Sequence, residues 1–588
     1  MRILVINLLR LGDLIQCSPV LRSLRTAYPE AHITLMAQDA FQETAFLVPG
    51  PDLVLPLPTR KIAPLLDREG AWPEAYGFLN DWLREHLEPP PDLVINLTPN
   101  FLGALLSFLC RSKEVRGLTL NAAKSFVTRP AWMTYLMVVS RARKANPFNL
   151  VDIFQLGAGL QPGGSGLAAK IPPEAHSQAE AALGGLGLSP ETSLVGLLPG
   201  ASQPQRCWPP EKYAQVARQL LSKRSCHFFI FGSRSEQPLG EKIARLLPPG
   251  TATLCAGGTS LAALAAMLSR LHLFISNDTG PMHLAAAVKT PVLAFFLAGA
   301  QARDTGPVGE GHISLEPRID CHPCHYPDSC SLFQCHQALS PEAVAAWALH
   351  LLERRPSTPI PDAPRWRDLQ VYLSTWDPTG HQAHLPLILR PLDRKHFWIL
   401  AHRIAWSRFL HGADAVSSSL TRWLNEVLER HFLPPEDGLG VRDGQAALRE
   451  MLEIASRGEE LARGILKISG LRHPPAFLWQ QAEAIRRIDP QLHRLGVSSP
   501  EIAAFIEFYF QEQRGQAEGD VNLLADHLSQ AYSRLGQAGK ICLEAGAEII
   551  RQHPIISAYL LNLEGGTNCA DLSGNPDLHQ IIEVAPCR

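Results

Sequence analysis

The feature that most restricts the fold of this 588-residue chain is an alternation of strand-like and helix-like segments that occurs twice. Short runs rich in Ile, Leu and Val stand at residues 2–8, 32–37 and 92–98, each bounded by Gly, Pro, Asn or Asp. Such runs are typical of parallel strands that are buried on both faces. Segment 18–29 begins with Ser-Pro and reaches Pro29, which predicts a helix between the first two strands.

The same alternation starts again after residues 160–174, a stretch rich in Gly, Pro and Ser that predicts a hinge. The strands predicted for this second module are 193–200, 227–232, 271–278 and 290–296. Its predicted helices are 208–223 and 281–289. Two such modules joined by a hinge predict two doubly wound α/β domains that face each other across a cleft.

The last third of the chain follows a different pattern. A second linker is predicted at 353–366, and from about residue 390 to 555 apolar residues recur at helical spacing. We therefore predict a Rossmann-like domain over 1–165, a second one over 175–352, and a mainly α-helical region over 366–588.

Composition limits the class of partner. A formal net charge of -2 and a pI near 6.9 provide no basic field for binding nucleic acid. We find no uncharged apolar run of about 18 residues and no secretory leader pattern, and so expect a cytoplasmic protein. Most of the twelve cysteines are scattered, as is usual for reduced cytosolic thiols.

The most informative motif is "SNDTGPMHLAAA" at 276–287. An apolar strand ends at Asp278, and Gly280 permits a tight turn into a helix. The free N–H groups and the positive dipole end of this helix can bind a diphosphate, with Thr279 and His283 as further donors. The alternative is a capped helix in which Asp278 only binds the first amides.

Two further motifs end predicted strands in glycine turns. In "LLPGASQPQRCWPPEKY", Ser202 and Arg206 precede a helix that opens with prolines, and Arg206 can hold a phosphate through two N–H groups. The alternative is a solvated surface loop. In the opening turn "RLGD", Asp13 can accept the proton of an attacking hydroxyl, or it can serve only as a helix cap or Asx turn.

In this order and at these separations, the three motifs resemble glycosyltransferase family 9, the ADP-heptose:lipopolysaccharide heptosyltransferases. The resemblance covers about residues 1–350 and does not extend into the C-terminal region. It implies a GT-B fold, with the acceptor on the first Rossmann-like domain and the nucleotide sugar on the second. It also implies inverting transfer that needs no cofactor for its chemistry.

Carried over by position, the resemblance implies that Asp13 is the general base. The donor-binding residues that it implies are Ser202, Arg206, Glu236, Asp278, Thr279, Gly280 and His283. Glu236 corresponds to the acidic residue that holds the ribose. Arg206 stands where family members usually have lysine. The arginine keeps the positive charge, but the geometry of its phosphate contact can differ from that of lysine.

Four cysteines with the spacing C-x2-C-x5-C-x4-C lie close together in the chain: Cys321, Cys324, Cys330 and Cys335. In a cytosolic protein this pattern favours a structural zinc or iron site over two disulfides, with His322, His325 or His336 as substitute ligands. Free or reversibly oxidised thiols and a redox role are the alternatives. Similar clusters occur in many family members, and in some relatives that modify proteins they hold iron.

The leading interpretation is an inverting heptosyltransferase in the synthesis of lipopolysaccharide core or a related surface glycan. A lipid-linked acceptor would bring such an enzyme to the inner face of the cytoplasmic membrane. A protein acceptor recruited by the helical region is one alternative. A non-catalytic scaffold that binds nucleotide sugars is another, which the joint presence of Asp13, Asp278 and His283 disfavours.

Overall fold

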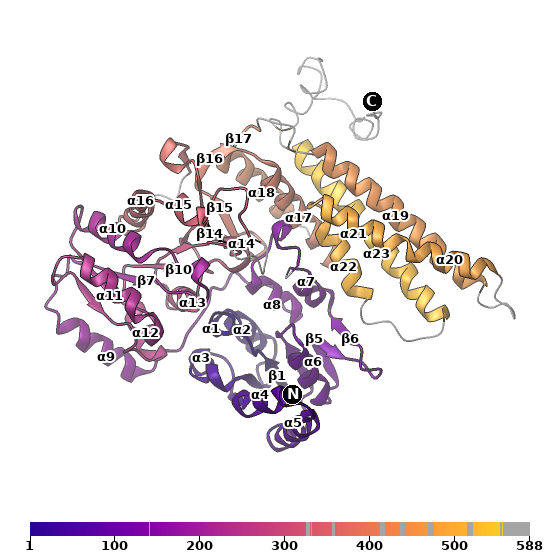
Figure 1. Ribbon diagram of the computed structural model, residues 1–588, viewed down its shortest axis with the longest axis horizontal. Helices are drawn as coiled ribbons and strands as arrows, with labels where there is room; N and C mark the ends of the chain where they lie inside the picture. The colour runs from indigo at the N-terminus through magenta and orange to yellow at the C-terminus, as the bar shows by residue number, and fades with distance from the viewer. Residues whose placement is uncertain are drawn as a thin grey trace, which may run out of the picture.

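The computed structural model describes residues 1–139, 141–324, 330, 332–355, 359–411, 418–435, 439, 441–468, 476–513, 521–552 and 556. These residues form two α/β lobes and an elongated helical region (Figure 1). In Figure 1 the first lobe lies at the bottom, the second at the left, and the long helices extend to the upper right. Within the described ranges, no helix is both long enough and apolar enough to cross a bilayer.

The first lobe is built on a six-stranded sheet in the order β3-β2-β1-β4-β5-β6, in which only β5 and β6 pair antiparallel. Its strands are β1 (Arg2–Ile6), β2 (His32–Gln38), β3 (Leu53–Leu57), β4 (Leu93–Asn96), β5 (Glu114–Leu120) and β6 (Phe126–Arg129). Its helices are α1 (Leu11–Gln16), α2 (Ser18–Ala27), α3 (Gln42–Leu47), α4 (Thr59–Asp67), α5 (Trp72–Leu87), α6 (Phe101–Leu109), α7 (Ala131–Val139) and α8 (Leu150–Gly157), with the 3-10 turns η1 (Asp39–Phe41) and η2 (Arg143–Ala145).

Successive side chains of β1 point to opposite faces of this sheet, and both faces are covered by helices. Ile3 and Val5 join the core formed with α1, α2, α3, α7 and α8, whereas Leu4 and Ile6 join the core formed with α4, α5 and α6. Burial on both faces explains why the strand is apolar without alternation. The three strands predicted in this lobe are confirmed as β1, β2 and β4.

The second lobe is built on an eight-stranded sheet in the order β15-β14-β12-β11-β10-β7-β8-β9. Its strands are β7 (Ser193–Leu198), β8 (Cys226–Ile230), β9 (Ala252–Leu254), β10 (Leu273–Asn277), β11 (Val292–Phe295), β12 (Ile313–Pro317), β14 (Leu369–Trp376) and β15 (Gln382–Pro386). Its helices are α9 (Pro173–Gly184), α10 (Pro210–Leu221), α11 (Gln237–Leu246), α12 (Leu261–Leu268), α13 (Gly280–Ala287), α14 (Ala302–Thr305), α15 (Gln334–Ala338) and α16 (Pro341–Leu352), with the 3-10 turns η3 (Pro204–Arg206) and η4 (Arg234–Glu236). The four strands predicted here are confirmed as β7, β8, β10 and β11.

The second sheet continues past residue 352, the predicted end of its domain. Strands β14 and β15 pair antiparallel beyond β12, so the first part of the predicted helical region belongs to this sheet. The predicted linker at 353–366 is also partly structured, because it contains β13 (Ile360–Pro361) and the 3-10 turn η5 (Pro364–Trp366). Buried Trp366, 2% exposed, anchors it.

The predicted hinge at 160–174 contains no helix or strand before α9 begins at Pro173. It is nevertheless tied to the first lobe, since the Ala168 N–H donates to Ser18 Oγ at 3.1 Å and the Lys170 N–H donates to the Leu47 carbonyl at 2.6 Å. These contacts hold the segment against the first lobe more firmly than its composition predicts.

The described residues after β15 are mainly helical, with two short strands among them. Its elements are β16 (Ile388–Pro391), α17 (Arg394–His411), α18 (Ser418–His431), β17 (Phe432–Leu433), α19 (Val441–Ile468), α20 (Ala476–Arg486), α21 (Ile488–Ser498), α22 (Ala503–Gln513) and α23 (Val521–Gln552). Helices α17, α19 and α22 pack against α23, and α22 also packs against α7 of the first lobe (Figure 1). The helical region therefore contacts the first lobe directly.

Candidate functional site

The predicted donor motifs meet where β7 and β10 end. These strands pair in parallel, so the loops that follow them leave the same edge of the sheet. The Asn277 side chain joins the loops, since its Oδ1 accepts from the Trp208 N–H at 3.1 Å and its Nδ2 donates to the Pro199 carbonyl at 2.9 Å. Asn277 is fully buried, and it fixes one loop relative to the other.

Arg206 and Asp278, one from each loop, form an ion pair in which Arg206 Nη1 donates to Asp278 Oδ2 at 3.2 Å. On the other side of the carboxylate, Thr305 Oγ1 donates to Oδ1 at 3.5 Å. Burial raises the pKa of Asp278, and the charges of Arg206 and Arg143 oppose this shift. The described hydrogen bonds of this carboxylate go to side chains and not to the first amides of α13, which argues against the capping alternative.

Asp13 lies in the first turn of α1, which follows β1, and the capping interpretation of its motif is confirmed. Its Oδ2 accepts from the Arg10 N–H at 3.2 Å, and Asn7 Nδ2 donates to its carbonyl at 3.0 Å. Burial raises the pKa of Asp13 to about 6, the Arg10 N–H lowers it, and the nearby charge of Asp278 raises it further. The carboxylate therefore caps its own helix and also faces the second lobe.

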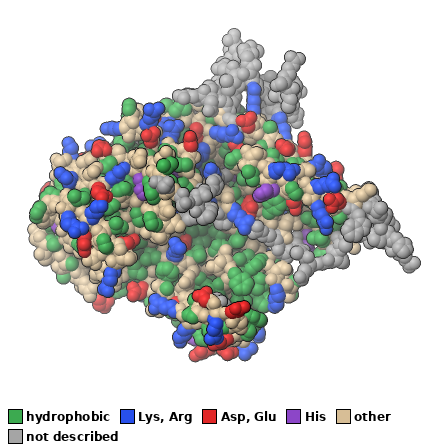
Figure 2. Space-filling model, viewed as in Figure 1, with side chains coloured by type: hydrophobic (Ala, Val, Ile, Leu, Met, Phe, Trp, Pro, Cys, Tyr) green, Lys and Arg blue, Asp and Glu red, His purple; other side chains and the backbone are tan. Residues whose placement is uncertain are grey.

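The lobes touch through two glycines. A Cβ at Gly12 would lie 2.8 Å from His283 Cδ2, and a Cβ at Gly280 would lie 2.6 Å from Leu11 Cδ2. Only residues without a side chain allow α1 and α13 to approach this closely. In Figure 2 a hollowed band runs between the first lobe, at the bottom, and the rest of the molecule.

His283 lies in this contact. Its Nε2 is 3.4 Å from Gln16 Nε2, and burial lowers its pKa to about 4, so the imidazole is neutral near pH 7. Its Nδ1 is buried and has no hydrogen-bond partner among the described residues. His283 can therefore act as a neutral hydrogen-bond donor.

Glu236 lies beside the turn that follows β7. Its Oε2 accepts from the Ser233 N–H and Oγ, both at 2.8 Å, which caps η4. A Cβ at Gly200 would lie 2.0 Å from Glu236 Oε1, so the glycine leaves the space that this oxygen fills. Ser202, in the same loop, is exposed. Thr279 is the half-buried N-cap residue of α13.

The predicted metal site is not supported. Among the described residues, no group of three or more His, Cys, Asp or Glu side chains is arranged to hold a metal ion, and the described cysteines form no disulfide. Burial raises the pKa of the Cys335 thiol, and Cys330 and Cys321 are near enough to add to that shift. His325 lies outside the described residues.

Two histidines of the cysteine-rich segment brace the donor loops instead. His322 Nε2 donates to the Ala300 carbonyl at 3.0 Å, and His336 Nε2 donates to the Gln205 carbonyl at 2.8 Å. Gln205 immediately precedes Arg206, and Ala300 lies in the loop that leads to Thr305. This segment therefore holds both loops that reach Asp278.

Arg143, in η2 of the first lobe, reaches this site although no sequence motif contains it. Its Nε donates to Asp304 Oδ2 at 2.8 Å, and Asn146 Nδ2 donates to the other oxygen at 2.8 Å. The basic run "RARK" was the available signal, but its position opposite Asp278 depends on how the lobes dock. Asn277 had a clearer signal, as a polar residue inside an otherwise apolar strand.

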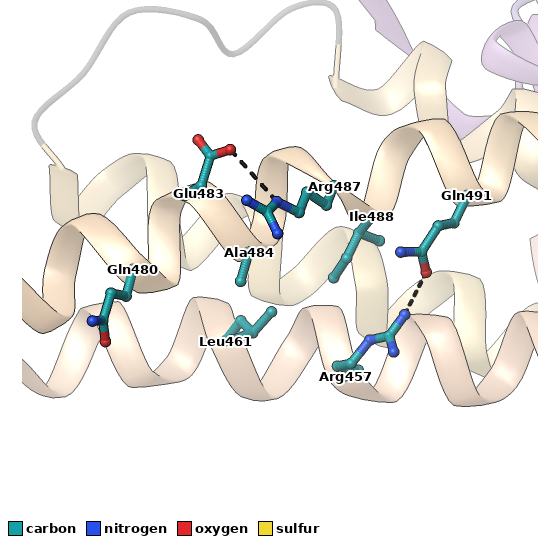
Figure 3. A pocket seen from close by; sticks show the side chains of 8 residues that line it. All are labelled: Arg457, Leu461, Gln480, Glu483, Ala484, Arg487, Ile488 and Gln491. Atoms are coloured by element: carbon teal, nitrogen blue, oxygen red, sulfur yellow. Dashed lines mark hydrogen bonds and ion pairs between the residues drawn. The ribbon is translucent and has the colours of Figure 1, made fainter.

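A groove of about 570 Å³ lies on the helical region, away from these loops (Figure 3). Two pairs of its polar side chains bind each other, as Figure 3 shows for Arg487 with Glu483 and for Arg457 with Gln491. With these groups already paired and without the strand-end residues, the groove is a weak candidate for the reaction site.

Comparison with known proteins decides the family. Residues 84–330 match the model of "Glycosyltransferase family 9 (heptosyltransferase)". This part of the chain belongs to glycosyltransferase family 9. The matched span, residues 84–330, includes every predicted donor-binding residue, whereas Asp13 lies before it.

Curated relatives of the family 9 region are heptosyltransferases. Lipopolysaccharide heptosyltransferase 2 of Salmonella typhimurium is 26% identical over 323 residues, covering 50% of this chain and 82% of the relative. Lipooligosaccharide heptosyltransferase 2 of Haemophilus influenzae is 34% identical over 110 residues, covering 18% of this chain and 32% of the relative. A solved family 9 structure from Veillonella parvula is 23% identical, covers 60% of this chain and 97% of its own, and has a TM-score of 0.49.

Proposed function

We propose that the protein is an inverting glycosyltransferase that moves heptose from ADP-heptose to a hydroxyl of the lipopolysaccharide core. One observation carries the proposal: Asp13 of the first lobe lies close enough to Asp278 of the second for their charges to interact, and Asp278 binds Arg206 just before α13 begins. The family match and the names of the relatives support the donor and acceptor classes. We assign the two lobes to the GT-B arrangement.

In the proposed reaction, the Asp13 carboxylate accepts the proton of the acceptor hydroxyl. The acceptor oxygen forms a bond to the anomeric carbon of heptose while the bond from that carbon to the β-phosphate oxygen breaks. ADP leaves with the electron pair of the broken bond. A single displacement from the opposite side inverts the anomeric configuration, so a second catalytic carboxylate is not required.

The charge that develops on ADP would be stabilised by the first N–H groups of α13 and by Arg206. Asp278 acts as a positioning residue, because its carboxylate orients Arg206. Glu236 Oε1 accepts from the ribose, since Oε2 is engaged in capping η4. A divalent cation is not part of this step, because a helix N-terminus and an arginine supply the positive charge.

We further propose that the enzyme works in the cytoplasm at an anionic membrane surface. Phe101 and Phe126 are 62% and 40% exposed and stack edge to face, with ring centroids 6.2 Å apart. Lys124 lies 4.1 Å from the centroid of the neighbouring Phe108 ring. Figure 2 shows hydrophobic side chains gathered over this part of the first lobe. An apolar patch beside a lysine suits anionic lipid headgroups.

The membrane proposal predicts sedimentation with vesicles that contain anionic phospholipid. Replacing both Phe101 and Phe126 with Ser should abolish that sedimentation and leave transfer to a water-soluble acceptor unchanged. Equal sedimentation of the wild-type and the doubly substituted protein would contradict this surface assignment.

The transfer proposal is tested by ADP release from ADP-heptose in the presence of a lipopolysaccharide core fragment that lacks the heptose to be added. We expect turnover that depends on the fragment, and a product whose anomeric configuration, determined by NMR, is opposite to that of the donor. Turnover only with a protein acceptor would replace the proposal with protein O-heptosylation. Tight ADP-heptose binding without turnover would indicate a non-catalytic scaffold.

A further inference from the structure

A pocket of about 660 Å³ lies where the three parts of the chain meet. The first lobe contributes η2 with Arg143 and Lys144, and the second lobe contributes the loop at Gly299. The helical region closes the pocket with α21 and α22, of which α22 packs against α7 and η2 (Figure 1). This size suits a small-molecule ligand or a short saccharide.

The first-lobe wall of the pocket is basic. Arg141 is paired with Glu507 of α22 at 3.2 Å, and Arg143 is paired with Asp304 at 2.8 Å. Lys144 is exposed and forms no ion pair with the residues that the structure describes. One cation therefore faces the pocket without a described acidic partner.

The opposite wall is largely apolar. The helices present Val497, which is 73% exposed, together with Ala503, Ile506 and Phe510. Because Val497 and Phe510 lie opposite the basic side chains of η2, the pocket is amphipathic. Such a pocket suits a ligand that has both an anionic group and an apolar or ring face.

The pocket also borders the proposed reaction site. Arg143 lines the pocket, and its positive charge lowers the pKa of Asp278. Asp304, which binds Arg143, precedes Thr305, which donates to Asp278. A ligand in this pocket would therefore lie next to the donor, on the side where the helical region joins the first lobe.

We propose that this pocket holds an anionic group, a phosphate, of a saccharide acceptor, so that the helical region completes the acceptor site. Lys144 binds the phosphate, and the α21–α22 wall covers the rest of the bound portion. This inference rests on the proposed transferase function and adds the acceptor chemistry and the role of the helical region.

The test compares two probes, a phosphorylated lipopolysaccharide core fragment and the same fragment after phosphatase treatment. Calorimetry measures binding of each to the full-length protein saturated with ADP. For the wild type we expect dephosphorylation to weaken binding about tenfold, the usual size of one charge-assisted contact. Lys144→Ala should bind the phosphorylated fragment about tenfold more weakly and should bind both fragments equally.

One further variant tests the helical wall of the pocket, and another is a control away from the pocket. Val497→Asp puts a negative charge at an exposed position of α21, and it should weaken binding of the phosphorylated fragment more than that of the other fragment. Lys61→Glu, on exposed α4 at the far side of the first sheet, is the matched control and should change neither. ADP affinity should stay the same in all three variants.

The outcomes distinguish this inference from the proposed function. If wild type transfers heptose and Lys144→Ala binds both fragments as wild type does, the pocket is not the acceptor site and the transferase assignment stands. If wild type neither binds nor modifies either fragment, both the inference and the proposed acceptor class are wrong.

Discussion

The carboxylates of Asp13 and Asp278 come from opposite lobes and lie close enough for the charge of Asp278 to raise the pKa of Asp13. Helix α1, which contains Asp13, contacts α13, which begins two residues after Asp278, through Gly12 and Gly280. An acid from one lobe therefore lies close to the strand ends of the other. This relationship leads to the following predictions.

Asp13→Asn should slow heptose transfer by at least about a hundredfold, because an amide cannot accept the proton of the acceptor hydroxyl. ADP affinity should change little, since Asn keeps the size of the side chain. Steady-state transfer and calorimetric ADP binding measure the two effects. Asp81→Asn, on exposed α5, is the control and should behave as wild type. Near-normal transfer by Asp13→Asn would show that Asp13 is not the general base.

The pH dependence of kcat/KM follows from the raised pKa of Asp13. The group must be ionised to act as a base, so kcat/KM should rise about tenfold per pH unit below pH 6 and level off above it. Asp278→Asn removes a negative neighbour and should shift this profile to lower pH. A profile that is flat between pH 5 and 7 in wild type would contradict the assignment.

The same raised pKa has a consequence for stability. Because the folded-state pKa lies above the ordinary value of 3.8, the carboxyl is stabilising when neutral, and that contribution is lost as pH rises through about 6. Asp13→Asn should therefore make thermal stability less dependent on pH between 4 and 7. A wild-type melting temperature whose pH slope is identical to that of the variant would contradict this expectation.

Arg206→Ala should weaken ADP binding first, with a smaller effect on kcat. A charge-assisted hydrogen bond contributes about 1.5–3 kcal/mol, which corresponds to a roughly ten- to hundredfold loss of affinity. Arg206→Lys should recover part of the loss, because it keeps the charge but not the planar fork. Unchanged ADP affinity in Arg206→Ala would exclude this residue from the diphosphate site.

Gly12→Ala should lower kcat at least about tenfold while ADP still binds, because the added methyl would meet His283 at 2.8 Å and force the lobes apart. Gly77→Ala on α5 is the matched control, since a Cβ there meets nothing within 4 Å. Wild-type kcat in Gly12→Ala would show that this close contact between the lobes is not needed for turnover.

The sequence predicted the strands with strong apolar runs, because burial on both faces leaves a continuous pattern. It missed β3 (LVLPL), whose run contains a proline, and β5 (EVRGLTL), whose charged residues break the pattern. Strands β14 and β15 were missed for another reason. They join the second sheet from beyond a proline-rich linker, and pairing at that distance has no local signal.

The residues of the candidate site also divide into those that a local sequence pattern predicts and those that it does not. Asp13, Arg206 and Asp278 follow strands, and the rule that parallel sheets bind ligands at strand ends could identify them. The approach of Gly12 to His283 and the position of Arg143 depend on how the lobes dock, which no local pattern encodes. The cysteine spacing predicted a metal site, whereas the described side chains in this segment brace loops, with His322 and His336 as hydrogen-bond donors.

The most direct measurement of the central claim is a crystal structure of the protein with ADP bound. The account predicts the diphosphate at the N-terminus of α13 within hydrogen-bond distance of Arg206, the ribose at Glu236, and the Asp13 carboxylate facing the terminal phosphate across the cleft. ADP bound away from the ends of β7 and β10, or an Asp13 side chain that points away from the nucleotide, would contradict it.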